Sequence, residues 1–461
     1  MKIKTIFSLA VLGALSFSTE AEVKMPAVFS DGMVLQQQSE VALWGSTDSK
    51  SGKVTITPSW DNRTYTVSAG KDGKWRTKIA TPAYGGPYYI EISDGDRISL
   101  NNVLIGDVWV CSGQSNMDMR VSGRYGDAVI GAQDAIFSPA NPDIRMFNVG
   151  AKLVGEPLED CTGKWEEASC ETVPEFSAAA YFFARKLNEL TGIPIGVIHA
   201  SYGGSRCEAW MSNEAAAKYK DDKRVQNASC LYNGMLNPVV GYGIKGCLWY
   251  QGEANTDYPE LYTTLFPDMV RDWRSHWDCG EFPFLYAQIA PYNYGDKKNS
   301  AFLREAQLQS LDLVPNSGMV VLMDIGRENT IHPMDKKPVG DRFACLALSK
   351  AYGKKVEGVE GPKYVGMEVD GDKLIVKFEN TGKGLTTYRQ PITGFEIAGE
   401  DHVFHPAKVR YTKDLKGLEL TSPDVPKPVA ARYDFVNYAK GCMFNSLGMP
   451  LSSFRTDNWE K

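Results

Sequence analysis

Several features are scarce or absent in this chain of 461 residues, and each absence narrows the possible functions. Lysine and arginine do not outnumber the acidic residues, and the net charge of -6 is unlike the basic surface of a nucleic-acid-binding protein. The cysteines contain no C-x-x-C pair, so a zinc site is not expected. No apolar run after the N-terminal segment is long enough for a membrane helix, and no repeat or low-complexity stretch is evident.

The N-terminal segment, residues 1–21, has the pattern of a secretory signal. Lys2 and Lys4 precede a short apolar core, and Thr19-Glu20-Ala21 is a plausible cleavage site. We therefore expect export, to a periplasm or out of the cell, and no membrane association after cleavage. The odd number of cysteines, 9, leaves at least one thiol free or paired between chains, while Cys161 and Cys170 could close a loop.

The rest of the chain divides into three parts by its hydrophobic pattern. Residues 22–105 contain short β-branched and aromatic runs separated by polar turns, the rhythm of a small β-sandwich. Residues 106–353 alternate apolar runs with helical periodicity. Residues 354–461 return to short strands and form a second β-rich module, which could pack against the first.

The middle part predicts an α/β domain with a parallel sheet. Strands are expected at Val108–Cys111, Ile195–His199, Gly246–Tyr250, Phe284–Ile289 and Met319–Asp324. Helices are expected around 176–190, around 261–273 and after Lys336, where apolar residues recur at spacings of three and four. Such sheets place their active sites outside the carboxyl ends of the strands.

Four polar segments follow predicted strands in this domain. The first, Ser112-Gly-Gln-Ser-Asn116, is a tight turn that would lift the hydroxyl of Ser115 above the sheet edge. The others contain Gly203-Gly204, Gln251-Gly-Glu-Ala-Asn255, and Asp324-Ile-Gly326 leading to His332. Each is weak alone, but together they could supply a nucleophile, a base and oxyanion donors, which predicts an ester hydrolase.

The scarcity of histidine, with 5 in the chain, limits the choice of base. His276 lies in a helical stretch, and His402 and His405 belong to the last module. His199 ends a strand, where a hydrogen-bonded near-core role is expected. His332 lies in a loop before a helix and is the preferred general base.

These segments resemble the sialate O-acetylesterase family of SGNH hydrolases. The resemblance is carried by Ser-Gly-Gln-Ser-Asn-Met, Ser-Tyr-Gly-Gly-Ser, Trp-Tyr-Gln-Gly-Glu-Ala-Asn and Ile-His-Pro-Met-Asp-Lys-Lys-Pro-Val-Gly-Asp-Arg. The opening Met25-Pro-Ala-Val-Phe and the closing Pro450-Leu-Ser-Ser-Phe also resemble that family, so the similarity spans nearly the whole mature chain.

The resemblance implies a flavodoxin-like three-layer α/β/α domain flanked by β-rich modules. It makes Ser115 the nucleophile and His332 the base. The oxyanion donors would be the N–H of Ser115, the N–H of Gly203 and a side-chain amide, for which Gln251 is preferred over Asn255. No metal or organic cofactor is expected.

The sequence departs from the resemblance at the acid that orients the histidine. Many SGNH hydrolases have an aspartate three residues before the histidine, where this chain has Asn329. Asp324, Glu328 and Glu253 are the candidate replacements. A Ser–His dyad steadied by a backbone carbonyl is the alternative.

The expected substrate is an O-acetylated carbohydrate, a sialic acid in the first place. Arg206 could pair with its carboxylate, although it could equally bridge Glu208. Asn116, Trp210 and Tyr250 are the other candidate substrate-binding residues, although strand-end aromatic residues more often close a core. The alternative substrate is an acetylated plant polysaccharide such as xyloglucan or xylan. The alternative functions are a carbohydrate-binding protein without turnover and a lipase. A lipase should show apolar lid helices, and none is found in the sequence.

Overall fold

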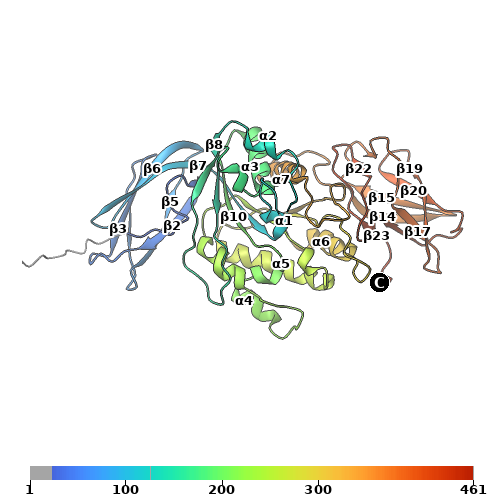
Figure 1. Ribbon diagram of the computed structural model, residues 1–461, viewed down its shortest axis with the longest axis horizontal. Helices are drawn as coiled ribbons and strands as arrows, with labels where there is room; N and C mark the ends of the chain where they lie inside the picture. Colours follow the sequence, from blue (N-terminus) through green and yellow to red (C-terminus); the bar gives the residue numbers. More distant parts are fainter. Residues whose placement is uncertain (1–22, 125, 460–461) are drawn as a thin grey trace, which may run out of the picture.

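The computed structural model describes residues 23–124 and 126–459, so the predicted signal at 1–21 lies outside the described residues. The chain forms three modules in a row, with the N-terminal β-rich module at one end of the molecule and the C-terminal one at the other (Figure 1). The two β-rich modules therefore do not pack against each other, contrary to the expectation from the sequence. Each packs instead on the central α/β domain.

The N-terminal module has two β-layers. One layer continues into the central sheet and contains β1 (Val34–Gln36), β3 (Lys53–Pro58), β4 (Tyr65–Ser68), β6 (Gly85–Ser93) and the first part of β7 (Arg97–Gly113). The other pairs β2 (Glu40–Ser46) with β5 (Lys74–Ala80). Alternate residues such as Val54 and Ile56 are fully buried between the layers, the period-two pattern of a sandwich.

Strand β7 crosses the predicted boundary between residues 105 and 106. Its first part pairs with β6 in antiparallel fashion, and its second part, from residue 107, pairs with parallel neighbours in the central sheet. Residues 103–113 are all buried, and the strand runs through Gly106 and Asp107 without a turn, so one extended strand serves both modules.

The central sheet is parallel except at one edge. Its order is β13 (Ser317–Val320), β12 (Phe284–Ala287), β11 (Gly246–Tyr250), β7, β10 (Ile195–Ser201), β8 (Asn141–Asn148) and the antiparallel β9 (Trp165–Ala168). The first strand of the domain, β7, lies between the third and fourth parallel strands in chain order, β10 and β11. In flavodoxin, by contrast, the first strand lies between the second and third. Ligands of open α/β sheets bind at the carboxyl ends of the strands where the order reverses, and here that place is the end of β7.

Helices cover both faces of this sheet, which confirms the predicted three-layer α/β domain. Helices α3 (Ala178–Thr191) and α7 (Lys336–Ala351) share a core with Trp109 and Cys111 of β7. Helices α5 (Pro259–Trp277) and α6 (Ala301–Leu313) pack on the other face, with Val108 and Val110. The remaining short helices lie in the connections: α1 (Ser115–Asp118), α2 (Ala132–Ile136), α4 (Asn213–Ala216), η1 (Val173–Glu175), η2 (Cys207–Trp210), η3 (Ala217–Tyr219), η4 (Tyr232–Leu236), η5 (Asn237–Val239) and η6 (Glu253–Asn255).

The C-terminal module is a sandwich around one core. One sheet contains β14 (Lys363–Asp370), β15 (Lys373–Glu379), β20 (Gly417–Thr421) and β19 (Lys408–Tyr411). The other contains β18 (Phe404–Pro406), β17 (Phe395–Ala398), β21 (Ala430–Tyr433) and β23 (Phe454–Arg455), and β16 (Leu385–Thr386) pairs with β22 (Phe444–Asn445). Leu374 and Leu418 of the first sheet meet Phe395 and Tyr433 of the second.

Two further expectations concern a disulfide between Cys161 and Cys170 and the lack of a membrane helix. All nine cysteines carry free thiols, so Cys161 and Cys170 do not close a loop through a disulfide. Within residues 23–124 and 126–459, no helix combines the length and the apolar character needed to span a bilayer.

Candidate active site

Ser115 lies at the carboxyl end of β7, at the start of α1. The strand ends at Gly113, whose φ of 140° and close contact with the next strand leave no room for a side chain: a Cβ there would lie 2.2 Å from the carbonyl oxygen of Tyr250. The N–H of Gln114 then donates to that same carbonyl at 3.0 Å. The turn thereby places Ser115 at the edge of the sheet, beside the loop that follows β11.

His332 meets Ser115 although 217 positions separate them in the chain. The imidazole Nε2 lies 2.9 Å from the Ser115 Oγ, which is hydrogen-bond distance. His332 stands in the loop between β13 and α7, and 15 % of its side chain is exposed. A hydroxyl in contact with a nitrogen base is the arrangement that activates a serine for nucleophilic attack.

The acid on the far side of the imidazole is Asp127, which was not predicted from the sequence. Its Oδ2 lies 3.7 Å from Nδ1 of His332 and accepts a hydrogen bond from the Thr330 hydroxyl at 2.9 Å. The distance to Nδ1 is longer than a hydrogen bond, so the carboxylate acts on the ring through its charge in this state of the site. Asp127 lies in a glycine-bearing loop after α1, not at a strand end, so the strand-end rule could not find it.

The three acids selected from the sequence have other partners. Asp324 forms a two-pronged ion pair with Arg342, with contacts of 2.9 and 2.6 Å. Glu253 accepts a hydrogen bond from the side chain of Asn116. Glu328 is exposed. The structure therefore contradicts all three as the partner of His332. Asp324 is paired with Arg342, Glu253 is bound to Asn116, and Glu328 is exposed to solvent.

The surroundings of His332 favour its neutral form. Burial lowers its pKa most, the positive charges of Lys336 and Arg124 lower it further, and Asp127 opposes them by raising it. A neutral imidazole near pH 7 can accept the proton of the Ser115 hydroxyl.

Two backbone N–H groups remain available for an oxyanion. Among the described residues, the N–H groups of Ser115 and Gly203 have no hydrogen-bond acceptor. Gly203 lies close to Arg124, since a Cβ there would lie 2.8 Å from a guanidinium nitrogen of that residue. Both groups therefore stay candidates for the oxyanion hole.

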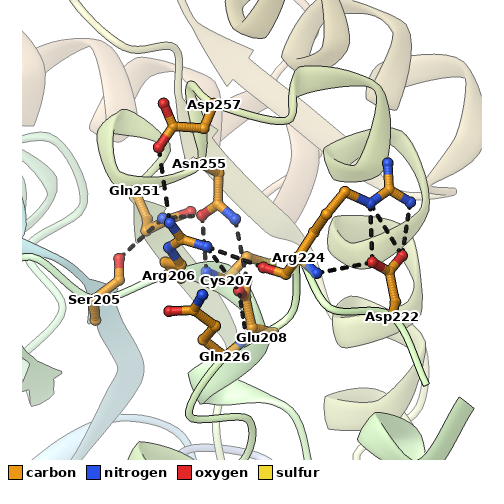
Figure 2. A network of polar contacts seen from close by, with 10 residues as sticks. All are labelled: Ser205, Arg206, Cys207, Glu208, Asp222, Arg224, Gln226, Gln251, Asn255 and Asp257. Atoms are coloured by element: carbon orange, nitrogen blue, oxygen red, sulfur yellow. Dashed lines mark hydrogen bonds and ion pairs between the residues drawn. The ribbon is translucent and has the colours of Figure 1, made fainter. Parts of the chain in front are cut away.

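The two candidate side-chain amides are engaged elsewhere. The Nε2 of Gln251 donates to the Asn255 Oδ1 at 2.7 Å and to the Ser205 carbonyl at 3.1 Å. The Nδ2 of Asn255 donates to the Glu208 carboxylate at 3.0 Å, and its Oδ1 also accepts from the N–H of Cys207 (Figure 2). These bonds tie the loop after β11 to the loop after β10, so the structure contradicts Gln251 and Asn255 as oxyanion donors.

Arg206 faces carboxylates of the protein itself. Its guanidinium lies 3.9 Å from Glu208 and 3.8 Å from Asp257, and it donates to the carbonyl of Arg224 at 3.0 Å (Figure 2). About a quarter of the side chain, 24 %, is exposed, on a cavity that Gly203 and Asn227 also line. The bridging role of Arg206 is therefore present, and its charge is largely matched by these two acids.

The other three candidate substrate contacts are buried within the protein. Trp210 and Tyr250 are 0 % exposed, and the Trp210 indole donates to the Ser205 hydroxyl at 2.9 Å. Asn116 is 1 % exposed, with its amide bound to protein groups on both sides. The structure contradicts the predicted substrate contacts of these residues, because each points into the core rather than toward solvent.

His199 has the near-core place expected for it. Its ring contacts the Ser201 hydroxyl at 2.7 Å and the Asn148 side chain at 2.9 Å. Burial lowers its pKa, so it is a neutral structural link. Among the described residues, no group of three or more histidine, cysteine or acidic side chains is arranged to hold a metal ion.

Comparisons with known proteins identify the family to which the chain belongs. Residues 105–348, which include Ser115, Asp127 and His332, match the family described as carbohydrate esterase, sialic acid-specific acetylesterase. The chain is 26% identical to the sialate O-acetylesterase of Mus musculus over 426 residues, which cover 77% of this chain and 78% of that protein. It is 28% identical to the sialate O-acetylesterase of Homo sapiens over 387 residues, covering 74% and 73% of the two chains.

A solved structure extends the likeness to the whole chain. A carbohydrate acetylesterase from Xanthomonas citri is 34% identical and superposes with a TM-score of 0.86, covering 95% of this chain and 100% of that one. The flanking β-rich modules are therefore shared along with the central domain.

Proposed function

Because the chain belongs to the sialic acid-specific acetylesterase family of carbohydrate esterases, and is thus a carboxylic ester hydrolase acting on carbohydrates, we propose that it removes O-acetyl groups from sialic acids. The reaction proceeds through an acetyl-serine intermediate on Ser115. The observation that carries the proposal is the 2.9 Å contact between the Ser115 Oγ and the His332 Nε2.

In the first half-reaction, Ser115 attacks the acetyl carbonyl while His332 takes the hydroxyl proton. The N–H groups of Ser115 and Gly203 stabilise the oxyanion, and each such donor typically contributes about 10²–10³-fold in rate. Asp127 stabilises the imidazolium that forms. His332 then returns the proton to the sugar oxygen as the ester C–O bond breaks.

In the second half-reaction, water takes the place of the sugar hydroxyl. His332 removes a proton from the water, which attacks the acetyl-serine, and the same N–H groups hold the oxyanion. Collapse of this intermediate releases acetate and returns the proton to Ser115. No group other than the enzyme, the ester and water is required.

Two lines of support favour a sialic acid as the sugar. The matching family and the mammalian relatives carry that substrate in their names. In the structure, the Arg124 guanidinium lies next to Gly203, and Arg206 lines the same cavity as Gly203. A guanidinium suits the carboxylate of a sialic acid.

A second candidate substrate is a neutral acetylated polysaccharide, such as xyloglucan or xylan. One observation favours it: Arg206 lies near Glu208 and Asp257, and Arg124 is paired with Asp118, so protein acids already balance both guanidinium groups. A neutral sugar would need no such cation.

We propose in addition that the protein is exported, to a periplasm or out of the cell, by the signal at residues 1–21. The proposal is supported by the Lys2 and Lys4 start, the short apolar core and the cleavage site of the sequence. The N-terminal sequence of protein recovered from outside the cytoplasm should begin directly after the cleavage site, at residue 22.

Acetate release from a panel of O-acetylated sialosides, xyloglucan and xylan tests the function. The wild-type protein should release acetate fastest from a sialoside, and Ser115→Ala should lower kcat by at least about 10³-fold. Faster release from the polysaccharides would replace the sialic acid with the second candidate. Acetate release that does not depend on Ser115 would refute the proposed mechanism.

A further inference from the structure

A buried cluster of three polar side chains lies directly behind the Ser115–His332 pair. Asn116 is at its centre. The Lys336 Nζ donates to the Asn116 Oδ1 at 2.6 Å, while the Asn116 Nδ2 donates to a Glu253 carboxylate oxygen and to the carbonyl of Ile331 at 3.0 Å. We refer to Asn116, Lys336 and Glu253 as the buried amide network.

The network joins the two halves of the active site. Asn116 follows Ser115 directly in the chain, and Ile331 directly precedes His332. One side-chain amide therefore connects the segment of the nucleophile to the segment of the base, which come from opposite ends of the domain sequence. The hydrogen bond to the Ile331 carbonyl fixes the peptide from which the imidazole extends.

The charged members of the network determine which way the amide faces. Lys336 can only donate, so the Asn116 oxygen must turn toward it. The Asn116 nitrogen then faces the Glu253 carboxylate and the Ile331 carbonyl, which can both accept. The reverse orientation would set the Asn116 oxygen against two acceptors, so Lys336 and Glu253 together hold the amide in the orientation that binds the His332 loop.

Both charged members lie deep in the protein. Lys336 is 0 % exposed at the start of α7, with its Nζ 5.1 Å from the centre of the Tyr250 ring, and burial lowers its pKa to about 7. Glu253 is also buried, its second carboxylate oxygen has no hydrogen-bond partner among the described residues, and burial raises its pKa. Burying a lysine in such surroundings costs desolvation free energy, so stability alone does not explain why it lies beside the active site.

We propose that the buried amide network is a positioning device for the esterase reaction: Asn116 fixes the distance between Ser115 and His332, and the protonated form of Lys336 favours the neutral imidazole. The inference rests on the proposed function of Ser115 and His332 and adds three positioning residues to it. None of the three is a catalytic residue, because the contacts of each are to other protein groups.

Titration of the His332 imidazole by NMR tests the electrostatic part without turnover. The charged groups that face His332 are Lys336, Asp127 and Arg124. Well below pH 7 Lys336 is mostly protonated, so Lys336→Met in a Ser115→Ala background removes a positive charge there and should raise the pKa of His332. The matched control is Lys337→Met, because Lys337 is exposed and pairs with Asp341, and it should leave the pKa of His332 unchanged.

A double variant guards against a folding defect in Lys336→Met. Lys336→Met/Glu253→Gln removes both charged members together, so that no buried charge is left without its counterpart. It should raise the pKa of His332 as the single variant does. A pKa of His332 that stays unchanged in both variants would overturn the electrostatic part of the proposal.

Steady-state kinetics with an acetyl ester test the positioning part. Asn116→Ala should lower kcat by about 10²-fold, the loss expected for a displacement of about 1 Å, with KM nearly unchanged. The double variant Asn116→Ala/Lys336→Met should lose less kcat than the product of the two single fold-losses. The reason is that both residues act through one amide. Wild-type kcat in a folded Asn116→Ala, or independent effects, would overturn the positioning role.

The NMR titration and the kinetic measurements distinguish a failure of this inference from a failure of the proposed function. If the wild-type protein shows no Ser115-dependent hydrolysis, the proposed function fails, and the NMR titration still decides whether Lys336 controls the imidazole. If hydrolysis depends on Ser115 and yet neither arm responds to the variants, the inference fails and the proposed function stands.

Discussion

Asp127 illustrates how a single residue can complete a site from an unpredicted place. It faces Nδ1 of His332 at 3.7 Å and is held there by the hydroxyl of Thr330, two residues before the histidine. Thr330 therefore links the acid to the loop of the base, and Asn329, at the position usual for the acid, is not needed for that role.

Replacing Asp127 by asparagine should reduce turnover without abolishing it. In serine proteases, the equivalent change costs about 10⁴-fold in kcat, where the acid is hydrogen-bonded to the imidazole. Here the longer contact predicts a loss in kcat/KM between about tenfold and 10⁴-fold. Rates with p-nitrophenyl acetate measure it, with exposed Glu328→Gln as the control that keeps the wild-type rate.

The same change should shift the pH dependence. Asp127 raises the pKa of His332, so Asp127→Asn lowers that pKa, and the neutral base persists to lower pH. The acidic limb of kcat/KM should therefore move to lower pH in Asp127→Asn, whereas Lys336→Met moves it to higher pH. An acidic limb at the wild-type position in Asp127→Asn would show that the carboxylate does not act on His332.

Among the helices, the crossing of α3 and α7 fixes the position of α7 beside the active site. Gly340 of α7 lies where the helices are closest: a Cβ would be 2.5 Å from the backbone nitrogen of Phe183 and 2.6 Å from the Phe182 Cβ. The same helix begins at Lys336, so its position on the sheet also sets the position of the buried amide network.

Gly340→Ala should destabilise the protein although alanine is the better helix former. Helix propensity favours alanine over glycine by about 1 kcal/mol, whereas overpacking a tight contact costs about 1–3 kcal/mol, and the neighbouring backbone atom cannot rotate away. We expect a lower unfolding temperature, measured by differential scanning calorimetry. Gly366→Ala in β14, which meets no atom within 4 Å, is the control. Equal or greater stability of Gly340→Ala would contradict the close crossing.

At the scale of the molecule, Arg304 of α6 fastens the C-terminal module to the catalytic domain. Its buried guanidinium donates to the hydroxyl of Ser453 at 2.9 Å and to carbonyl groups of residues 434, 436 and 437. Burial lowers its pKa to about 10, so the side chain stays charged at neutral pH. One buried cation thus satisfies several acceptors of another module.

Arg304→Met should loosen this attachment. The substitution keeps much of the apolar stem and leaves the carbonyl groups without their donor, a loss of about 3 kcal/mol or more for a buried charged group. The unfolding temperature should fall, and proteolysis should cleave between the catalytic domain and the C-terminal module sooner. Exposed Arg410→Met in the same module is the control, and equal protease resistance of the two variants would contradict the role of Arg304.

The sequence by itself determined the local elements and the order of the chemistry along the chain. Apolar runs predicted five strands of the central sheet, the three- and four-residue spacing predicted α3, α5 and α7, and the strand-end segments carried Ser115, Gly203 and His332, whereas β8 and α6 were not predicted. These signals are local, because periodicity and turn residues are read within a few positions.

Only the tertiary structure decided which polar groups meet. Asp127 joins His332 across a loop, Asn116 turns inward to the buried amide network, and Gln251 and Asn255 bind neighbouring loops instead of an oxyanion. Trp210 and Tyr250 close the core rather than stack on a sugar. The physical reason is that each hydrogen bond depends on side-chain direction and on competition among partners that are distant in the chain, and neither is encoded in local spacing.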